Sequence, residues 1–129
     1  MGTYSDVMIS VTPKGYEKIK KDQEKFADYE LLKLFEITNF EKNGKSLILL
    51  KTEDTIKYYP EYEDIKQLEK TLSKLKDGYV FARFGEEIGD IEFRNKAKIK
   101  ELLEPFQFIK KFSNNINKEF EKKEEEEFE

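Results

Sequence analysis

Four carboxylates in a glycine-containing turn form the most concentrated set of chemically active side chains in the sequence. They belong to Glu86, Glu87, Asp90 and Glu92, in the segment GEEIGDIE that begins at Gly85. A hard cation needs several such oxygens converging on one point, but this order lacks the alternating acids and the final glutamate of an EF-hand loop. We therefore predict no metal and no cofactor, and we expect the turn to dock onto a basic surface of a protein partner.

Tyrosines gather at a second position, where Lys57, Tyr58, Tyr59 and Tyr62 surround a proline. Tyrosine supplies a large contact area at low entropic cost and is enriched in protein interfaces. The competing interpretation is that some of these rings are half-buried and seal the sheet against the next helix. We predict that these four residues contribute to a protein-binding patch.

The residue types that most enzymes use for catalysis are missing. The chain of 129 residues contains no His, no Cys and no Trp, so a general base would have to be Asp, Glu, Lys or Tyr. The glycines lack the spacing of a phosphate-binding loop, and no Ser-x-x-Lys motif occurs. A pair of carboxylates that hydrolyses glycosides is the remaining enzymatic alternative. We predict a protein that is not an enzyme and that works in a reducing cytoplasm.

Charge is distributed unevenly along the chain. The net charge is −4, but residues 119–129 contain seven acids against two lysines. Subtracting these from the 28 acids and 24 bases of the chain leaves 21 acids and 22 bases for residues 1–118, a net charge of +1. A near-neutral body argues against direct nucleic-acid binding, because phosphate contacts dominate that affinity, and equally against mimicry of DNA. No apolar stretch is long enough to span a membrane, and the acidic end would be repelled by anionic lipid.

One alternative does involve nucleic acid. Tyr79, Phe81 and Arg83 fall on the same face of one predicted strand. RNA-binding domains with ferredoxin-like sheets stack bases on aromatic residues in such positions. The signature of those domains, with Gly and Phe interleaved after a basic residue, is absent. A small RNA-binding module is therefore an alternative function, and burial of these rings in the core is its competing interpretation.

Hydrophobic periodicity predicts the elements that position these residues. Alternation at Val7, Ile9 and Val11 indicates a strand, Thr12-Pro13 a helix start, and Asn43-Gly44 a hairpin turn. The expected strands are 6–12, 33–41, 45–51, 55–59, 79–84 and a short edge strand over 90–94, and the expected helices are 13–27 and 61–76. We predict an α+β domain over residues 1–95, with the ferredoxin-like order β-α-β-β-(β)-α-β, a mostly antiparallel sheet and its helices on one face.

A helical C-terminal arm is expected over residues 96–120, followed by an acidic tail over residues 121–129. Pro105 should break or kink this arm. Apolar side chains then recur every three or four positions, at Phe106, Ile109, Phe112, Ile116 and Phe120. This stripe can pack on its own sheet, on a copy of itself or in a groove of a partner. A self-associating structural or assembly protein, in the form of a homodimer, is thus a further alternative.

Residues 54–92 contain the run Asp54-Thr55-Ile56-Lys57-Tyr58-Tyr59, a predicted helix carrying Ile65 and Leu68, and the segments 78–86 (GYVFARFGE) and 89–92 (GDIE). This pattern resembles small phage-encoded proteins of unassigned function. The resemblance implies a location in the cytoplasm of a bacterial host. It covers about a third of the chain and implies a phage or prophage origin, without an activity. Small phage proteins that lack catalytic residues often bind and block host machinery, including immune nucleases. The resemblance therefore implies a protein that inhibits a host factor by protein–protein contact, with a defence nuclease of the CRISPR type as one candidate partner.

Overall fold

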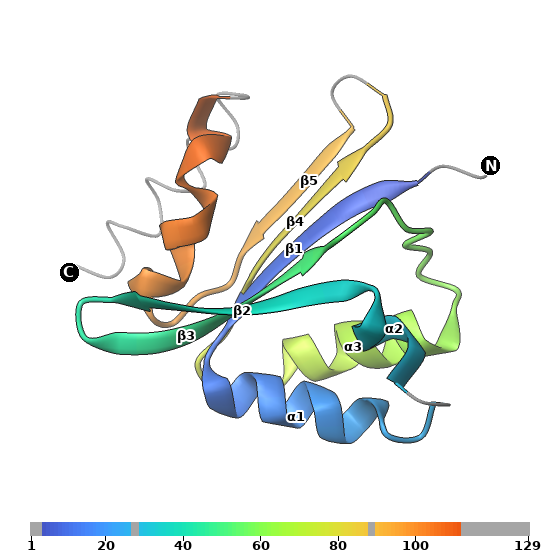
Figure 1. Cartoon of the computed structure of the whole chain (residues 1–129), viewed down its shortest axis with the longest axis horizontal. Coiled ribbons are helices and arrows are strands. Elements are labelled where there is room, and N and C mark those ends of the chain that lie inside the picture. Colours follow the sequence, from blue (N-terminus) through green and yellow to red (C-terminus); the bar gives the residue numbers. More distant parts are fainter. Residues whose placement is uncertain (1–3, 27–28, 88–89, 112–129) are drawn as a thin grey trace.

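A computed structural model describes residues 4–26, 29–87 and 90–111, with side chains up to Phe108 in the last helix. The chain folds into a five-stranded antiparallel sheet with helices on both sides (Figure 1). This confirms the predicted α+β class and the mostly antiparallel sheet. In chain order, the elements are β1 (Ser5–Val11), α1 (Pro13–Gln23), α2 (Glu30–Lys33), β2 (Phe35–Lys42), β3 (Lys45–Thr52), α3 (Glu63–Ser73), β4 (Val80–Gly85), β5 (Ile91–Asn95) and the 3-10 helix η2 (Lys100–Lys111).

The strands lie in the order β2-β3-β1-β4-β5, so β1 is central. Its register places Ile9 opposite Leu50 of β3 and opposite Phe81 of β4. The predicted short edge strand is confirmed as β5, which pairs with β4. The predicted strand over residues 55–59 is wrong: this segment is joined to the sheet only by an isolated bridge between Ile56 and Ser5. Pro60 follows directly and has no N–H for a ladder, which limits pairing there.

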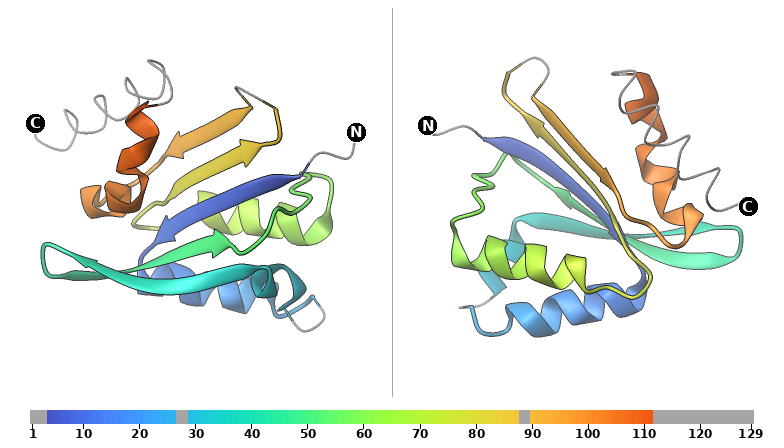
Figure 2. Two further views of the ribbon diagram at one scale, coloured as in Figure 1. Left: turned by 45° about the horizontal axis from the view of Figure 1, so that its top comes forward. Right: turned by 180° about the vertical axis from the view of Figure 1, so that it is seen from behind.

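The start of α1 follows from its sequence. Thr12 has extended backbone angles, and its hydroxyl accepts a hydrogen bond from the Gly15 N–H at 3.1 Å. Pro13 follows in the first turn, where its missing N–H costs nothing. The helix ends at Gln23, short of the predicted residue 27. Together with α3, α1 covers one face of the sheet, as Figure 2 shows.

The sheet has a separate apolar core on each face. Between the sheet and the helices α1 and α3 lie the side chains that point one way from β1, such as Val7 and Ile9, with Phe81 from β4. On the other face, Met8 and Val80 pack against side chains of η2. Figure 2 shows η2 on the side of the sheet opposite α1 and α3. The expectation of helices on one face only is therefore incomplete, because η2 covers the second face.

Part of the predicted C-terminal arm can be placed. Residues 100–111 form η2, and Pro105 lies inside it without ending it, so of the two predicted effects, a break or a kink, the break does not occur. A proline removes only its own N–H from the ladder, and tight packing of the neighbouring apolar residues on the sheet holds the turn in place. Phe112, Ile116, Phe120 and the acidic tail 121–129 lie outside the described residues. No helix in the described part of the chain is both long enough and apolar enough to cross a membrane.

Two glycines occupy left-handed backbone conformations in different surroundings. Asn43 (φ 52°) and Gly44 (φ 77°) form the predicted hairpin turn between β2 and β3. Gly78 (φ 76°) ends the loop after α3. A Cβ added at Gly44 would meet no atom within 4 Å, whereas one added at Gly78 would lie 2.0 Å from the Lys96 carbonyl oxygen. The backbone of residues 96–98 thus crosses directly over Gly78.

These two positions give a matched stability test. Gly44→Ala should lower the free energy of unfolding by about 1 kcal/mol, the cost of a left-handed alanine. Gly78→Ala should lower it by about 3 kcal/mol or more, because the same backbone cost is joined by a collision with main-chain atoms that cannot rotate away. Urea denaturation of both variants measures the difference. Equal losses would contradict the close approach of Lys96 to Gly78.

Candidate functional site

The only two arginines of the chain lie side by side on the sheet face that carries α1 and α3. Arg83 stands on β4 and Arg94 on β5, and the register pairs Arg83 with Glu92 and Phe81 with Arg94. Both side chains are partly buried, with 21% and 24% of their surface exposed. We call the arginines and the carboxylates around them the arginine clasp, consisting of Glu69, Arg83, Asp90, Glu92 and Arg94.

Arg94 is held on several sides. Its two terminal nitrogens donate to Glu69 of α3 at 2.6 and 2.9 Å, a two-pronged arrangement that matches the guanidinium fork to the carboxylate. One of them also donates to the Tyr79 hydroxyl at 3.2 Å. The guanidinium carbon lies 3.9 Å from the centre of the Phe81 ring, which is fully buried. A lysine could not reproduce this combination of planar stacking and forked donation.

Arg83 of β4 binds carboxylates at the start of β5. It donates to Asp90 at 2.9 Å, to the Ser5 hydroxyl at 3.0 Å and to Glu92 at 3.3 Å. The other oxygen of Glu92 lies 3.2 Å from Nε of Arg94, so this carboxylate bridges both arginines. Gly85 is required next to this arrangement, because an added Cβ would lie 1.6 Å from a carboxylate oxygen of Asp90.

The electrostatics of the clasp keep Glu69 and Asp90 ionised. Burial by itself would raise the pKa of Glu69, but hydrogen bonds from Arg94 and Tyr58 outweigh burial, and the net pKa is below the usual value. The Arg83 guanidinium likewise lowers the pKa of Asp90. Burial, with the Glu69 charge beside it, raises the pKa of Tyr58, whose hydroxyl donates to Glu69. Carboxylates with lowered pKa and a phenol with raised pKa are poorly suited to proton transfer near neutral pH.

A hollow of about 370 Å³ adjoins the clasp. Its wall contains two arginines and two glutamates, so the formal charges of its lining cancel. These four side chains already bind one another across the hollow. The clasp therefore closes the chain on itself and holds β4, β5 and α3 together.

The predicted acidic turn is divided by this arrangement. Asp90 and Glu92 face the arginines and are neutralised by them. Glu86 accepts a hydrogen bond from the Tyr4 backbone N–H at 3.0 Å, and Glu87 is exposed. The four carboxylates are therefore not equally free: Asp90 and Glu92 form ion pairs with the arginines while remaining 35% and 44% exposed, and docking of this turn onto a partner stays a prediction.

The predicted tyrosine patch is also divided. Tyr58 is buried with 8% exposure, and its ring packs 5.5 Å from that of Phe81, so it cannot contact a partner. Lys57 is exposed, and Tyr62 has 41% of its surface exposed. Tyr59 is half-buried, with its ring 5.2 Å from that of Tyr62. The patch therefore consists of Lys57 and Tyr62, supported by Tyr59.

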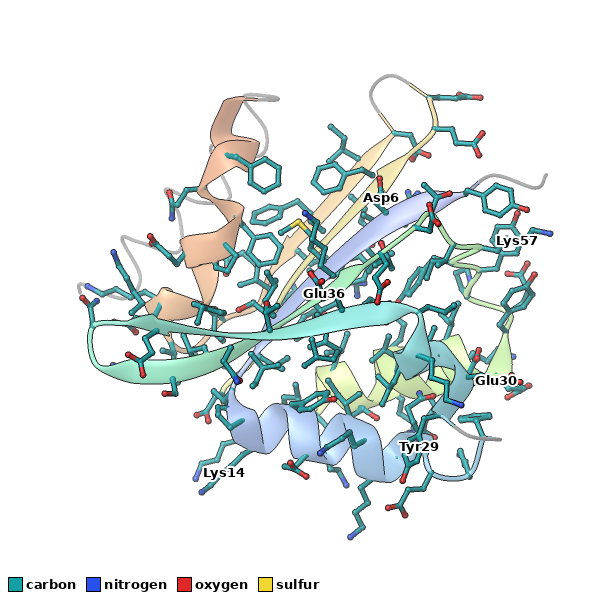
Figure 3. The ribbon with its side chains drawn as sticks, in the orientation of Figure 1. Asp6, Lys14, Tyr29, Glu30, Glu36 and Lys57 are labelled. Atoms are coloured by element: carbon teal, nitrogen blue, oxygen red, sulfur yellow. The ribbon has the colours of Figure 1, made fainter. Side chains whose placement is uncertain are left out.

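Lys57 and Tyr62 line a shallow groove of about 620 Å³ that the sequence did not reveal. The groove runs between α2 and the start of α3, and we call it the docking groove. Its lining consists of Glu30, Leu31, Lys33, Leu34, Lys57, Tyr62, Asp64 and Ile65. Glu30 and Lys57 lie on the same side of the molecule in Figure 3, with Tyr29 beside Glu30. The exposed Leu34 gave no signal in the sequence, because one leucine before a strand does not disclose which way it points.

Two other predicted surfaces are buried. Phe81 is fully buried and Tyr79 has 6% exposure, so neither ring can stack on a base, and Arg83 is committed to the clasp. The RNA-binding arrangement is therefore corrected to core packing. Phe106, predicted for self-association, is fully buried against its own sheet. The side chain of Ile109 lies outside the described part of the chain.

No family model, curated protein or solved structure matches the chain. Within residues 4–26, 29–87 and 90–111, no three His, Cys, Asp or Glu side chains are grouped so that they could hold a metal ion. Two arrangements stand out in this part of the molecule: the arginine clasp, whose charges are paired with one another, and the docking groove, where Leu34 and Tyr62 face solvent.

The clasp generates a prediction with an internal control. Glu69→Gln should lower the free energy of unfolding by about 2–3 kcal/mol at neutral pH, because it leaves Arg94 without its main counter-charge. Glu63→Gln, six residues earlier on α3, removes an exposed pair with Lys66 and should cost less than about 0.5 kcal/mol. Urea denaturation of the wild type and of both variants measures the two losses in the free energy of unfolding. Equal losses would contradict the prediction.

Low pH should abolish the difference in stability between the wild type and Glu69→Gln. Because the pKa of Glu69 is lowered in the folded state, its stabilising effect is complete above the usual value of 4.5 and is lost as the pH falls through the native pKa. The stabilities of the wild type and of Glu69→Gln should therefore converge below pH 4.5. A difference that persists unchanged into acid would contradict an ionised Glu69 as the partner of Arg94.

Proposed function

We propose that this protein is a non-enzymatic inhibitor that binds a host factor through the docking groove. The observation that carries the proposal is the position of the exposed apolar side chains. Among the described residues, five large hydrophobic side chains are exposed: Tyr4, Tyr29, Leu34, Tyr62 and Phe108. Leu34 and Tyr62 line the groove, Tyr29 adjoins it, and Tyr4 lies beneath the ammonium of Lys57 at 5.6 Å. Such gathering favours a contact surface over random exposure.

The chemistry of the groove supports a protein partner. Its floor is apolar, with Leu31 and Ile65 buried, and its exposed aromatic and aliphatic anchors are Tyr62 and Leu34. Charges of both signs form its rim, at Glu30, Lys33, Lys57 and Asp64. An apolar centre inside a polar rim, with tyrosine among the anchors, is the usual anatomy of a protein interface. A partner with one large apolar side chain between charged neighbours fits this surface.

The anchors are held in place before any partner arrives. Tyr62 is the N-cap residue of α3, its carbonyl accepts from the Lys66 N–H at 2.9 Å, and its N–H donates to the Tyr59 carbonyl at 3.0 Å. Leu34 ends α2, and its N–H donates to the Leu31 carbonyl at 3.1 Å. Fixing these residues in advance reduces the entropy lost on binding.

The choice of host factor rests on the sequence. The chain lacks His and Cys, and residues 54–92 resemble small phage-encoded proteins. Both features support a protein that acts by obstruction in the cytoplasm of an infected bacterium. A defence nuclease of the CRISPR type is the partner class that we propose to test first.

We further infer that β1 to β4, with α1 and α3, form a ferredoxin-like unit. In support, β3 lies between β2 and β1, and β4 flanks β1 on its other side. On this interpretation β5 and η2 are additions to the unit. β5 supplies Arg94 to the clasp, and η2 covers the second face of the sheet.

The inhibitor proposal predicts that groove variants lose binding while a matched variant does not. Tyr62→Glu places a charge among the apolar anchors and should reduce partner capture by at least about tenfold, the effect expected of an interface anchor. Phe108→Glu is the control, because Phe108 has a similar exposure, 43% against 41%, and belongs to η2.

The experiment is an affinity capture from bacterial lysate, with and without nuclease treatment, followed by an activity assay of the captured factor. The proposal requires one protein that both the wild type and Phe108→Glu retain after nuclease treatment and that Tyr62→Glu loses. Its activity should fall when the wild type is added and stay unchanged with Tyr62→Glu. Capture of nucleic acid alone, or equal capture by all three proteins, would overturn the proposal.

A further inference from the structure

Within the part of the chain that the structure describes, one segment covers the sheet face opposite α1 and α3. We call η2, residues Lys100–Lys111, the strap. Its side chains Leu102, Leu103 and Phe106 are buried against Met8 and Val80, and against Leu47 and Ala82 beside them. Removal of the strap would expose a continuous apolar surface across three strands, which could not remain free in water.

The strap is a weak element by its own backbone. It is a 3-10 helix of 12 residues, whereas such helices seldom exceed three or four residues because their hydrogen bonds are poorly aligned. Pro105 lies inside it and removes one donor. Its stability therefore depends on the sheet beneath it and not on its own hydrogen bonds.

The sheet face under the strap contains two buried polar side chains whose hydrogen bonding is incomplete among the described residues. Ser10 and Asn95 lie opposite Val80 in the register, one on each side, so all three point toward the strap. Both are fully buried, and among the described residues neither the Ser10 hydroxyl oxygen nor the Asn95 side-chain nitrogen has a hydrogen-bond partner. Burying such groups unpaired is unfavourable. Lifting the strap returns both atoms to water and offsets part of the apolar exposure.

The strap is tied to the body by a small polar latch at the tip of the β2–β3 hairpin. Glu101 accepts a hydrogen bond from the Asn43 side chain at 2.9 Å and lies 3.5 Å from the Lys45 ammonium. Lys42 and Glu104 form a second pair at 3.5 Å. The side chains of Lys42, Lys45 and Glu104 are 44–50% exposed, so these ion pairs are screened by salt.

The chain just before the strap is anchored firmly. The Lys96 N–H donates to the Tyr79 carbonyl and the Lys98 N–H to the Asp77 carbonyl, each at 2.9 Å. The body can therefore keep its structure while the strap lifts from about residue 99. A weak segment beyond a fixed anchor is the geometry that permits exchange of an element between copies.

We infer that the strap is exchanged between two copies of this chain, each strap seating on the partner copy's sheet. The strap itself is the segment that the structure shows to fit this face, so a second copy supplies the same apolar contacts and the same latch. Phe106 then joins the two copies while remaining buried, which reconciles its burial with the self-association expected from the sequence. Both docking grooves stay open, because Glu30 and Lys57 lie at the end of the molecule away from the strap (Figure 3).

The test uses the full wild-type chain and its own latch. Heavy-isotope and light chains are mixed at high concentration, separated by size, and treated with a carbodiimide, which joins a lysine to an adjacent carboxylate without a spacer. In a species of twice the 15.4 kDa chain mass, about half of the Lys45–Glu101 links should join a heavy peptide to a light one, as expected for random pairing in an exchanged dimer. Absence of that species, or links within one isotope only, would overturn the inference.

A charge exchange provides a second, independent test. Lys45→Glu and Glu101→Lys each place like charges in the latch of one chain. Mixed together, they form complementary latches only between chains, so the mixture should give a heterodimer that neither variant gives by itself. The chain carrying both changes restores the pair internally and should match the wild type in its fraction of dimer. A mixture that remains monomeric while the doubly changed chain is folded would again exclude exchange.

Discussion

The structure depends on a central strand that is apolar on both faces. In β1, Val7, Ile9 and Val11 point to one side and Met8 to the other, and all four are buried. A strand with two apolar faces requires a cover on each side of the sheet. The chain provides α1 and α3 for one face and η2 for the other. The neighbouring β3 meets the same requirement, with Leu47, Ile48 and Leu50 buried on alternating sides.

Helix cover on the first face does not extend over the whole sheet, and the arginine clasp completes it. Beyond Phe81, the side chains of β4 and β5 on that face are charged, so they can be partly buried only if their charges are matched. Arginine suits this task because its fork binds a carboxylate through two hydrogen bonds while its plane stacks on an aromatic ring. This explains the composition. Lysine serves the solvated surface, and the chain's two arginines occur where charge must be held within the fold.

The sequence predicted those helices and turns that are determined by residues close together in the chain. Thr12-Pro13 marked a helix start, Asn43-Gly44 marked a hairpin, and the spacing of Ile65, Leu68 and Leu72 marked α3, because capping, turn geometry and helical periodicity act over a few residues. The site could not be read in the same way. Asp90 and Glu92 resembled a free acidic turn because their partner Arg83 lies on the adjacent strand, and Arg94 finds Glu69 across 25 residues of sequence. The scarcity of arginine was the one available signal for the clasp.

The docking groove, proposed to bind a partner, and the strap, proposed to be exchanged between copies, differ in how well their backbones are hydrogen-bonded. Tyr62 and Leu34 lie at helix ends, where backbone hydrogen bonds hold their main-chain atoms. The strap is a long 3-10 helix, and the sheet beneath it contains two polar groups that have no hydrogen-bond partner in the described part of the chain, so the strap is the easier of the two features to displace. Because the two features share no residue, opening one leaves the geometry of the other intact. A dimer joined by its straps would then present two grooves, and simultaneous engagement of a partner with two matching sites would raise the apparent affinity without any new contact.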